Sequence, residues 1–208
     1  MNYLFDFRID SKEVQEIMKK DLRLAKLINM IGDLKIQLPS DHFRSLCRNI
    51  VGQQLSVKAA ATIWKRFQEG CGELSPEGIL AMKEEALRAF GLSRSKVVYI
   101  KDLCHKIIDQ EIILTEFNQL TDQEVISNLT KVKGIGKWTA EMFLIFSLGR
   151  LDVFAMEDLG LKRAVKWIYD LEELPKKKAL EEYSQIWMPH RTIASLYLWE
   201  GINQKIIP

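Results

Sequence analysis

Apolar residues recur along most of this chain every three or four positions, which is the spacing of one face of an α-helix. One such stripe consists of Phe43, Leu46, Cys47, Ile50 and Val51, and the same spacing recurs in Ala140, Phe143 and Leu144, with the small Ser147 at the next position. Runs that alternate apolar and polar residues are scarce, and the best strand candidate, residues 111–114, is short. The pattern therefore predicts an all-α fold of roughly ten helices with little or no sheet.

Turn-forming and capping residues divide the helical segments. Gly32 ends the first long helix. Thr121, followed three residues later by Glu124, forms a capping box that opens a helix over residues 122–129. Pro175 stands near the start of a further helix, where proline is tolerated. We expect short links between the helices throughout.

The composition is that of an ordinary soluble globular protein, with 47% apolar and 28% charged residues. No apolar run approaches the ~18–20 residues that a membrane span needs. The first ten residues contain acids and no basic stretch before an apolar one, so we expect no secretory signal and an intracellular protein. The net charge of +2 permits binding to nucleic acid without implying it.

The three cysteines and three histidines are widely spaced. Because no C-x-x-C pair occurs and the histidines lack metal-ligand spacing, neither a zinc site nor an iron–sulfur cluster is expected. The sequence carries no other cofactor signature, so we expect no cofactor chemistry.

The most informative stretch of the sequence reads LTKVKGIGKWTA. Gly134 and Gly136 permit a tight turn, and the apolar Ile135 between them attaches the turn to the core. Such a turn leaves backbone amides free at the start of the next helix, where an anion such as phosphate binds. Lys133 and Lys137 flank the turn and add positive charge. A simple packing corner between two helices is the alternative explanation.

A second motif, DVFAMEDLGL, contains Asp158, which lies twenty residues beyond Trp138. Asp158 precedes an apolar-periodic segment, so it is a natural N-cap for a helix over residues 159–167. From the residues alone, a helix cap is a sufficient explanation of this aspartate.

Together the two motifs resemble those of the helix-hairpin-helix superfamily of DNA glycosylases. The matching positions of the second motif are Asp152, Val153, Phe154, Asp158, Leu159, Gly160 and Leu161. The resemblance implies that Asp158 is the catalytic carboxylate and that the hairpin around Gly134, Gly136, Lys133 and Lys137 binds the DNA backbone. It also implies that hairpin carbonyls hold a monovalent cation, Na⁺ or K⁺. By position these carbonyls belong to Thr130, Val132 and Ile135.

The segment IVGQQLS resembles the part of the 3-methyladenine DNA glycosylase II family that enters the DNA stack. Extruding a base leaves a gap, which a side chain usually fills. The match places Gln54 at this wedge position, with Leu55 as the alternative. A polar end of a helix, without a role in DNA binding, also explains this segment. The segment GLSRSK resembles a second loop of that family that contacts the backbone, where Ser93 and Lys96 would meet a phosphate.

Trp138 and His190 are the candidates for a pocket that receives the flipped base. Electron-poor alkylated purines stack well on aromatic faces, although His190 stands where the family usually has an aromatic residue. Trp138 also occupies the position at which strand-cleaving members carry a nucleophilic lysine, and Lys137 is turned from it by about 100° on a helix. We therefore expect hydrolysis without strand cleavage. Three further aromatic residues are expected in the core: Trp187, Trp199 and Tyr197.

The resemblance implies two helical lobes, residues 43–149 and residues 1–42 with 150–208, with a DNA-binding cleft between them. The implied activity is hydrolysis of the N-glycosidic bond of alkylated purines such as 3-methyladenine and 7-methylguanine. Two alternatives stay open: a glycosylase for another damaged or mismatched base, and a non-catalytic DNA-binding module. We expect a monomer that binds damaged double-stranded DNA, does not bind membranes, and resides in the cytoplasm at the bacterial nucleoid, or in the nucleus of a eukaryote.

Overall fold

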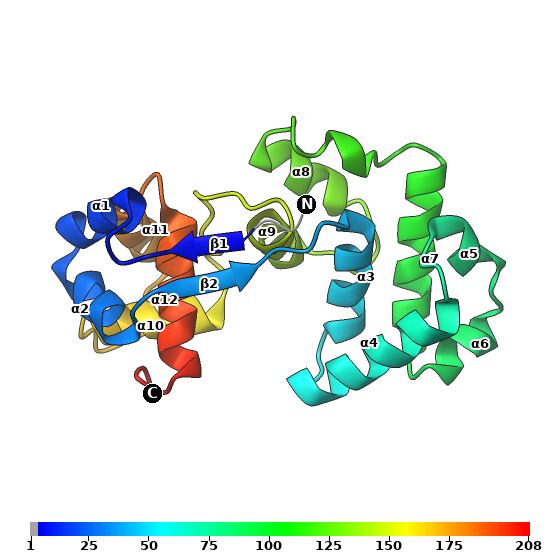
Figure 1. Cartoon of the computed structure of the whole chain (residues 1–208), viewed down its shortest axis with the longest axis horizontal. Coiled ribbons are helices and arrows are strands. Elements are labelled where there is room, and N and C mark those ends of the chain that lie inside the picture. Colours follow the sequence, from blue (N-terminus) through cyan, green and yellow to red (C-terminus); the bar gives the residue numbers. More distant parts are fainter. Residues whose placement is uncertain (1–3) are drawn as a thin grey trace. The chain divides into compact units, whose positions relative to one another are not determined.

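The computed structural model describes residues 4–208 and divides them into two compact units (Figure 1). The first unit consists of the residues up to Ser40 together with Leu144–Pro208, and the second consists of Asp41–Phe143. The second unit therefore begins at Asp41 rather than at residue 43, and it ends at Phe143 rather than at residue 149. Twelve α-helices and a single two-stranded sheet occur within residues 4–208, which confirms the all-α class.

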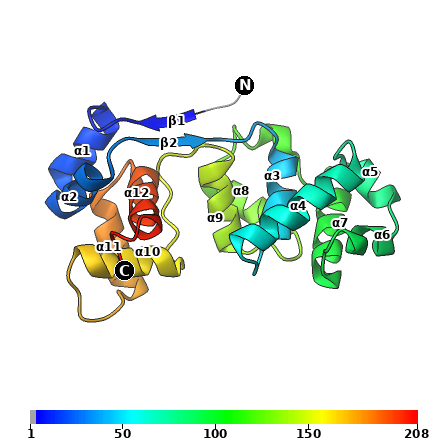
Figure 2. The same cartoon turned by 60° about the horizontal axis from the view of Figure 1, so that its bottom comes forward.

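The first unit is built around its last helix, which is buried along nearly its whole length. Its elements are β1 (Leu4–Phe7), α1 (Lys12–Lys20), α2 (Leu22–Ile31), β2 (Leu34–Gln37), α10 (Leu159–Ile168), α11 (Lys177–Ile186) and α12 (Arg191–Asn203). α12 packs against α2 and α10, and Figures 1 and 2 both show it at the centre of this unit. Eight of its residues are buried, so its apolar character extends around the helix rather than along one stripe.

β1 and β2 form an antiparallel ladder in which Phe5 pairs with Ile36. Each strand has only four residues, which is too short for an alternating pattern to stand out in the sequence. The best strand candidate of the sequence, residues 111–114, is not a strand. Residues 111–113 form no strand, and Leu114 begins a short 3₁₀ helix, η1 (Leu114–Glu116).

The second unit packs its helices around a long central one. Its elements are α3 (His42–Gly52), α4 (Val57–Cys71), α5 (Pro76–Ala81), α6 (Glu84–Ala89), α7 (Arg94–Ile108), η1, α8 (Asp122–Leu129) and α9 (Lys137–Phe146), whose last residues belong to the first unit. α7 packs against α3, α5 and α6. The predicted capping box opens α8, with Thr121 and Glu124 bonded reciprocally.

No helix in the described range is long and apolar enough to cross a membrane. Within residues 4–208 there is also no group of three or more His, Cys, Asp or Glu side chains that could hold a metal ion. The three cysteines are free thiols. Burial raises the pKa of the Cys104 thiol to about 12, so this thiol is not a reactive nucleophile at neutral pH.

Candidate functional site

The glycine-rich hairpin forms the tight turn between α8 and α9 that its sequence predicts. Gly134 has a φ of +78°, a conformation that side-chain-bearing residues rarely adopt. A Cβ atom at this position would overlap the ring of Tyr99. Ile135 is buried and donates its amide to the carbonyl of Val132 at 3.1 Å. The turn is thus fixed from both sides, by Ile135 in the core and by Tyr99 over the glycine.

Both lysines that flank the hairpin reach solvent. The Lys133 ammonium lies 3.5 Å from Oδ1 of Asp102, and the Lys137 ammonium lies 3.6 Å from Oε1 of Glu141. The Lys133 amide also donates to Oδ2 of Asp102 at 2.9 Å, which ties the hairpin to α7. Both ammonium groups are more than half exposed, whereas the carboxylates of Asp102 and Glu141 are only 17% and 5% exposed.

The carbonyls of Thr130, Val132 and Ile135 belong to the same turn, and their oxygens are donors of the kind that a monovalent cation takes. Carbonyl oxygens have two lone pairs each. That of Val132 accepts the Ile135 amide and keeps one lone pair for a further contact. Neutral oxygen donors of this kind suit Na⁺ or K⁺ rather than a transition metal.

The segment that follows α3, residues 53–55, forms a turn, which we call the wedge turn. Gln54 is exposed and has a φ of +57°, the left-handed region that few residues other than glycine adopt. Leu55, the alternative wedge residue, is 37% exposed. Ser56 then caps α4 by accepting the amide of Ala59 at 3.3 Å. Both candidate wedge side chains therefore stand at the surface on a sharp turn.

Ser93 and Lys96 lie at the start of α7. The Ser93 hydroxyl accepts the Lys96 amide at 3.3 Å and so caps this helix. The Lys96 ammonium donates to the carbonyl of Val51 at 2.8 Å, and burial lowers the pKa of this lysine. The lysine that the sequence assigns to a phosphate thus has a backbone partner at the end of α3.

Two hollows adjoin the wedge turn in the second unit. One, of about 590 Å³, is lined by six of the predicted site residues: Gln54, Leu55, Ser93, Lys96, Gly134 and Trp138. The other, of about 500 Å³, is lined mainly by α3, α4 and α9, and it shares Gln54, Leu55 and Trp138 with the first. The Trp138 side chain is 45% exposed, unlike most aromatic residues of the chain. Three segments that are distant in the sequence therefore meet at common hollows.

Asp158 lies in the first unit, where it begins α10 as predicted. Its Oδ1 accepts the amide of Leu161 at 2.8 Å and the indole N–H of Trp199 at 3.2 Å. A Cβ atom added at Gly160 would lie 3.0 Å from the same oxygen, so glycine leaves room for the carboxylate. Glu157, the neighbouring acid, is exposed. The carboxylate of Asp158 is therefore half-buried and fixed in direction.

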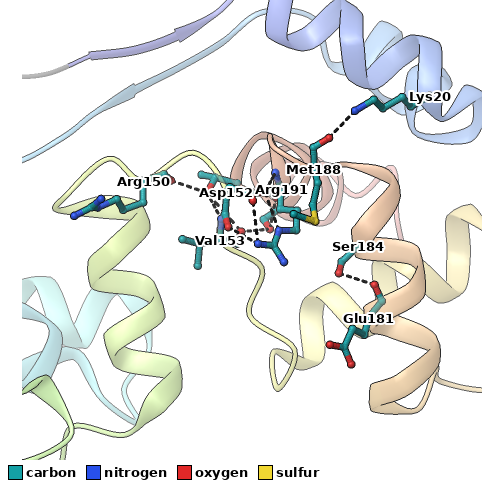
Figure 3. Close-up of polar contacts among 10 residues, drawn as sticks. Lys20, Arg150, Asp152, Val153, Glu181, Ser184, Met188 and Arg191 are labelled. Carbon is teal, nitrogen blue, oxygen red and sulfur yellow. Dashed lines mark hydrogen bonds and ion pairs between the residues drawn. The ribbon is translucent and has the colours of Figure 1, made fainter. Parts of the chain in front are cut away.

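The loop that leads to Asp158 is attached to the start of α12 (Figure 3). The Arg191 guanidinium binds the Asp152 carboxylate through two bonds of 2.8 and 3.0 Å. The Thr192 hydroxyl accepts the amide of Val153 at 3.0 Å and donates to the carbonyl of Arg150 at 2.7 Å. Asp152, the first residue of the motif, thus has a positioning role that its sequence spacing did not reveal.

His190 also lies in the first unit, at the start of α12. Its Nε2 lies 2.9 Å from Oε2 of Glu16, and its side chain is only 13% exposed. The hydrogen bond from His190 lowers the pKa of Glu16. Of the three aromatic residues expected in the core, Trp187 and Tyr197 are buried, whereas Trp199 is only partly buried and contacts Asp158.

Several known proteins are similar to this chain. DNA-3-methyladenine glycosylase 1 of Schizosaccharomyces pombe is 36% identical, over 86% of this chain and 80% of that protein. The crystal structure of a DNA-3-methyladenine glycosidase from Bacillus halodurans is 41% identical with a TM-score of 0.83, and the match covers 96% of this chain and 92% of that one. The structure of S. pombe 3-methyladenine DNA glycosylase (Mag1) in complex with abasic DNA is 32% identical with a TM-score of 0.81, over 91% and 96% of the two chains.

The family described as "HhH-GPD superfamily base excision DNA repair protein" matches residues 47–190. This range contains the wedge turn, the hairpin, Asp158 and His190. The chain belongs to the HhH-GPD superfamily of base excision DNA repair proteins.

Proposed function

We propose that this protein is a monofunctional DNA glycosylase that hydrolyses the N-glycosidic bond of alkylated purines in double-stranded DNA. The observation that carries the proposal is the fixed, half-buried carboxylate of Asp158, held by the start of α10 and by Trp199. Its relatives named DNA-3-methyladenine glycosylases support the class of substrate.

Asp158 acts on the deoxyribose. As the bond between C1′ and the purine nitrogen breaks, its electron pair leaves with the base and positive charge develops on the sugar. A carboxylate held in place stabilises this oxocarbenium charge without having to reorganise. The same group orients water, whose oxygen bonds to C1′ and whose proton passes to the carboxylate. A cationic alkylated purine is already a good leaving group, so a strong general acid is not required.

The second unit binds the DNA backbone. In this proposal the hairpin amides around Gly134 and Gly136 bind one phosphate, with Lys133 and Lys137 adding charge. A monovalent cation held by the carbonyls of the same turn would supply further positive charge beside that phosphate. Ser93 caps α7 beside this region and offers a second backbone contact.

The flipped base and the gap that it leaves need separate groups. Gln54, with Leu55 beside it, fills the gap in the stack. Trp138 stacks on the extruded base, and its exposed indole is suited to this contact. No lysine stands at the position of Trp138, so no Schiff base forms and the DNA strand stays intact. His190 adds a polar group whose ring is held by Glu16.

Release of free bases from methylated DNA tests the proposal. The wild-type protein should release 3-methyladenine and 7-methylguanine without nicking the strand, whereas Asp158→Asn should not. Glu157→Gln, at the exposed neighbouring acid, is the matched control and should behave as wild type. If wild type releases no alkylated base but removes an oxidised or mismatched base, the substrate class is wrong. If it binds DNA and releases no base at all, the chain is a non-catalytic module.

A further inference from the structure

We infer that Gln53 and Lys96 are positioning residues. Before DNA binds, they hold the wedge turn in the conformation in which Gln54 can fill the gap left by the extruded base. The inference rests on the proposed function, because it concerns how Gln54 is presented to the duplex. It assigns a role to Gln53 that the sequence did not suggest, and it gives Lys96 a role other than contact with a phosphate.

The wedge turn needs support from outside itself. Gln54 lies in the left-handed region with a φ of +57°, a conformation that persists only where surrounding contacts impose it. Its local backbone bonds are long: the Gln53 amide lies 3.4 Å from the Ile50 carbonyl, and the Leu55 amide lies 3.3 Å from the Gly52 carbonyl. Hollows adjoin the turn, so close packing does not hold it either.

Gln53 supplies one outside contact. Its Nε2 donates to the carbonyl of Gly134 at 2.8 Å, across 81 positions of the sequence. Gly134 itself is fixed by its left-handed φ and by the ring of Tyr99. The bond therefore connects the wedge turn to the rigid part of the hairpin, so that the group that fills the gap and the group that binds phosphate keep a constant spacing.

Lys96 supplies the other outside contact. It binds Val51, which precedes Gln53 in the chain, whereas Gln54 follows Gln53. Its ammonium donates to the Val51 carbonyl at 2.8 Å, in the last turn of α3. Carbonyls in a last turn have no partner within their helix and carry partial negative charge, so a cation is favoured there. Burial lowers the pKa of Lys96, which is consistent with an amine drawn out of solvent towards this carbonyl.

A positioning role and a purely structural role predict different kinetics. Single-turnover release of 7-methylguanine is measured from two oligonucleotide duplexes. In one, the lesion is paired with cytosine, and in the other it lies in an internal loop where it is already unpaired. Extrusion is costly only in the paired duplex, so only there does the wedge contribute to the rate. A change that affects the chemistry or the fold slows both reactions equally.

We expect Gln53→Leu to slow release from the paired duplex by about 5- to 10-fold, the effect of one lost hydrogen bond, and release from the loop by less than about 2-fold. Gln54→Ala should show the same selectivity, and the double variant should be no slower than Gln54→Ala alone. Gln123→Leu, at an exposed glutamine of α8 in the same unit, should leave both rates unchanged.

Lys96→Met should reproduce the selective loss, and Lys96→Arg should restore the paired rate because a guanidinium can donate to the same carbonyl. The inference would be overturned if these variants slowed base release equally from both duplexes. It would also be overturned if neither Gln53→Leu nor Lys96→Met slowed base release from the paired duplex. If Gln53→Leu does not fold, the two lysine variants carry the test.

A second readout does not depend on catalysis. 2-Aminopurine placed beside the lesion fluoresces more strongly when it loses its stacking partner, and it is measured with Asp158→Asn protein. Gln53→Leu in that background should lower the fluorescence rise at saturating protein. An unchanged rise contradicts the inference, whereas absence of base release by wild type contradicts only the proposed function.

Discussion

The two units hold their candidate functional residues in different ways. In the second unit the wedge turn, the start of α7 and the hairpin lie far apart in the sequence, and their exposed side chains line common hollows. In the first unit Asp158 is half-buried, and its Oδ1 accepts hydrogen bonds from Leu161 and Trp199 of the same unit. Recognition in the proposed reaction thus uses exposed turns, whereas the chemistry uses a side chain fixed within the fold.

This difference shows why a residue proposed as a catalytic carboxylate can also be explained as a helix cap. Asp158 is a helix cap, and the capping bond fixes the direction of the oxygen that the proposed chemistry needs. In the second unit, Gln54 and Leu55 are exposed on a turn, whereas Gly134, Ser93 and the two residues proposed to hold that turn also make contacts within the fold. Substitutions at Asp158 should therefore change the rate of base release and, where the cap is lost, stability. Substitutions in the hairpin should change DNA binding and, at Gly134, stability.

The largest effect should come from separating the two roles of Asp158. Asparagine caps helices as well as aspartate does, so Asp158→Asn should keep the free energy of unfolding while the rate of base release falls by about 10²–10³-fold. Asp158→Ala should lose the same activity and also about 1 kcal/mol of stability. Urea unfolding and single-turnover rates measure the two quantities. Comparable activity of Asp158→Asn and wild type would mean that Asp158 is only a cap.

The glycines of the hairpin should behave differently from each other. Gly134→Ala forces a left-handed φ on alanine and overlaps Tyr99, so it should lower the free energy of unfolding by about 1–3 kcal/mol and abolish tight DNA binding. A Cβ at Gly136 meets nothing within 4 Å, so Gly136→Ala should leave stability unchanged and affect DNA affinity alone. Equal stability losses in urea unfolding would contradict this division.

A smaller effect is expected at Gly160, which gives the carboxylate its space. An added methyl group would lie 3.0 Å from Oδ1 of Asp158 and displace it. Small displacements of a reacting group are costly, so Gly160→Ala should slow base release on the order of 10-fold. Stability should change little, because the higher helix propensity of alanine offsets the weakening of the Asp158 cap. Leu159→Ala, at an exposed residue of the same helix, is the control, and an unchanged rate in Gly160→Ala would show that the carboxylate position tolerates the methyl group.

Local signals in the sequence predicted the parts of the structure that depend on neighbouring residues. The apolar stripe of α3, the capping box of α8, the turn at Gly134 and the cap at Asp158 all involve contacts within about one helical turn. The strands β1 and β2 were missed because each has four residues and a partner about thirty positions away, which no local pattern reveals.

The positioning contacts of the site were missed for the same reason. The bond from Gln53 to Gly134 spans 81 positions, and the bond from Trp199 to Asp158 spans 41. Trp199 appeared to be a core residue because it lies in a helix that is apolar on all sides. The resemblance to the glycosylase motifs suggested the groups of the proposed reaction, but the groups that orient them depend on the tertiary fold.

The smallest predicted effects concern charge, and they test whether contact with the DNA backbone belongs to the hairpin. Each lost phosphate contact should reduce the slope of log affinity against log salt concentration by about 0.9. Lys133→Ala and Lys137→Ala should each show this reduction. Lys65→Ala, which removes the exposed ion pair between Lys65 and Glu69 in α4, should not.

The salt dependence of DNA affinity also tests the role of Lys96. An ammonium bound to the Val51 carbonyl releases no counterions from DNA. The salt slope of Lys96→Met should equal that of the wild type, although this variant slows release from the paired duplex. A slope reduced by about 0.9 would instead make Lys96 a phosphate contact, and its bond to Val51 would then be a resting position that DNA displaces. The salt titration therefore decides between the two roles of this lysine, whatever its effect on the rate.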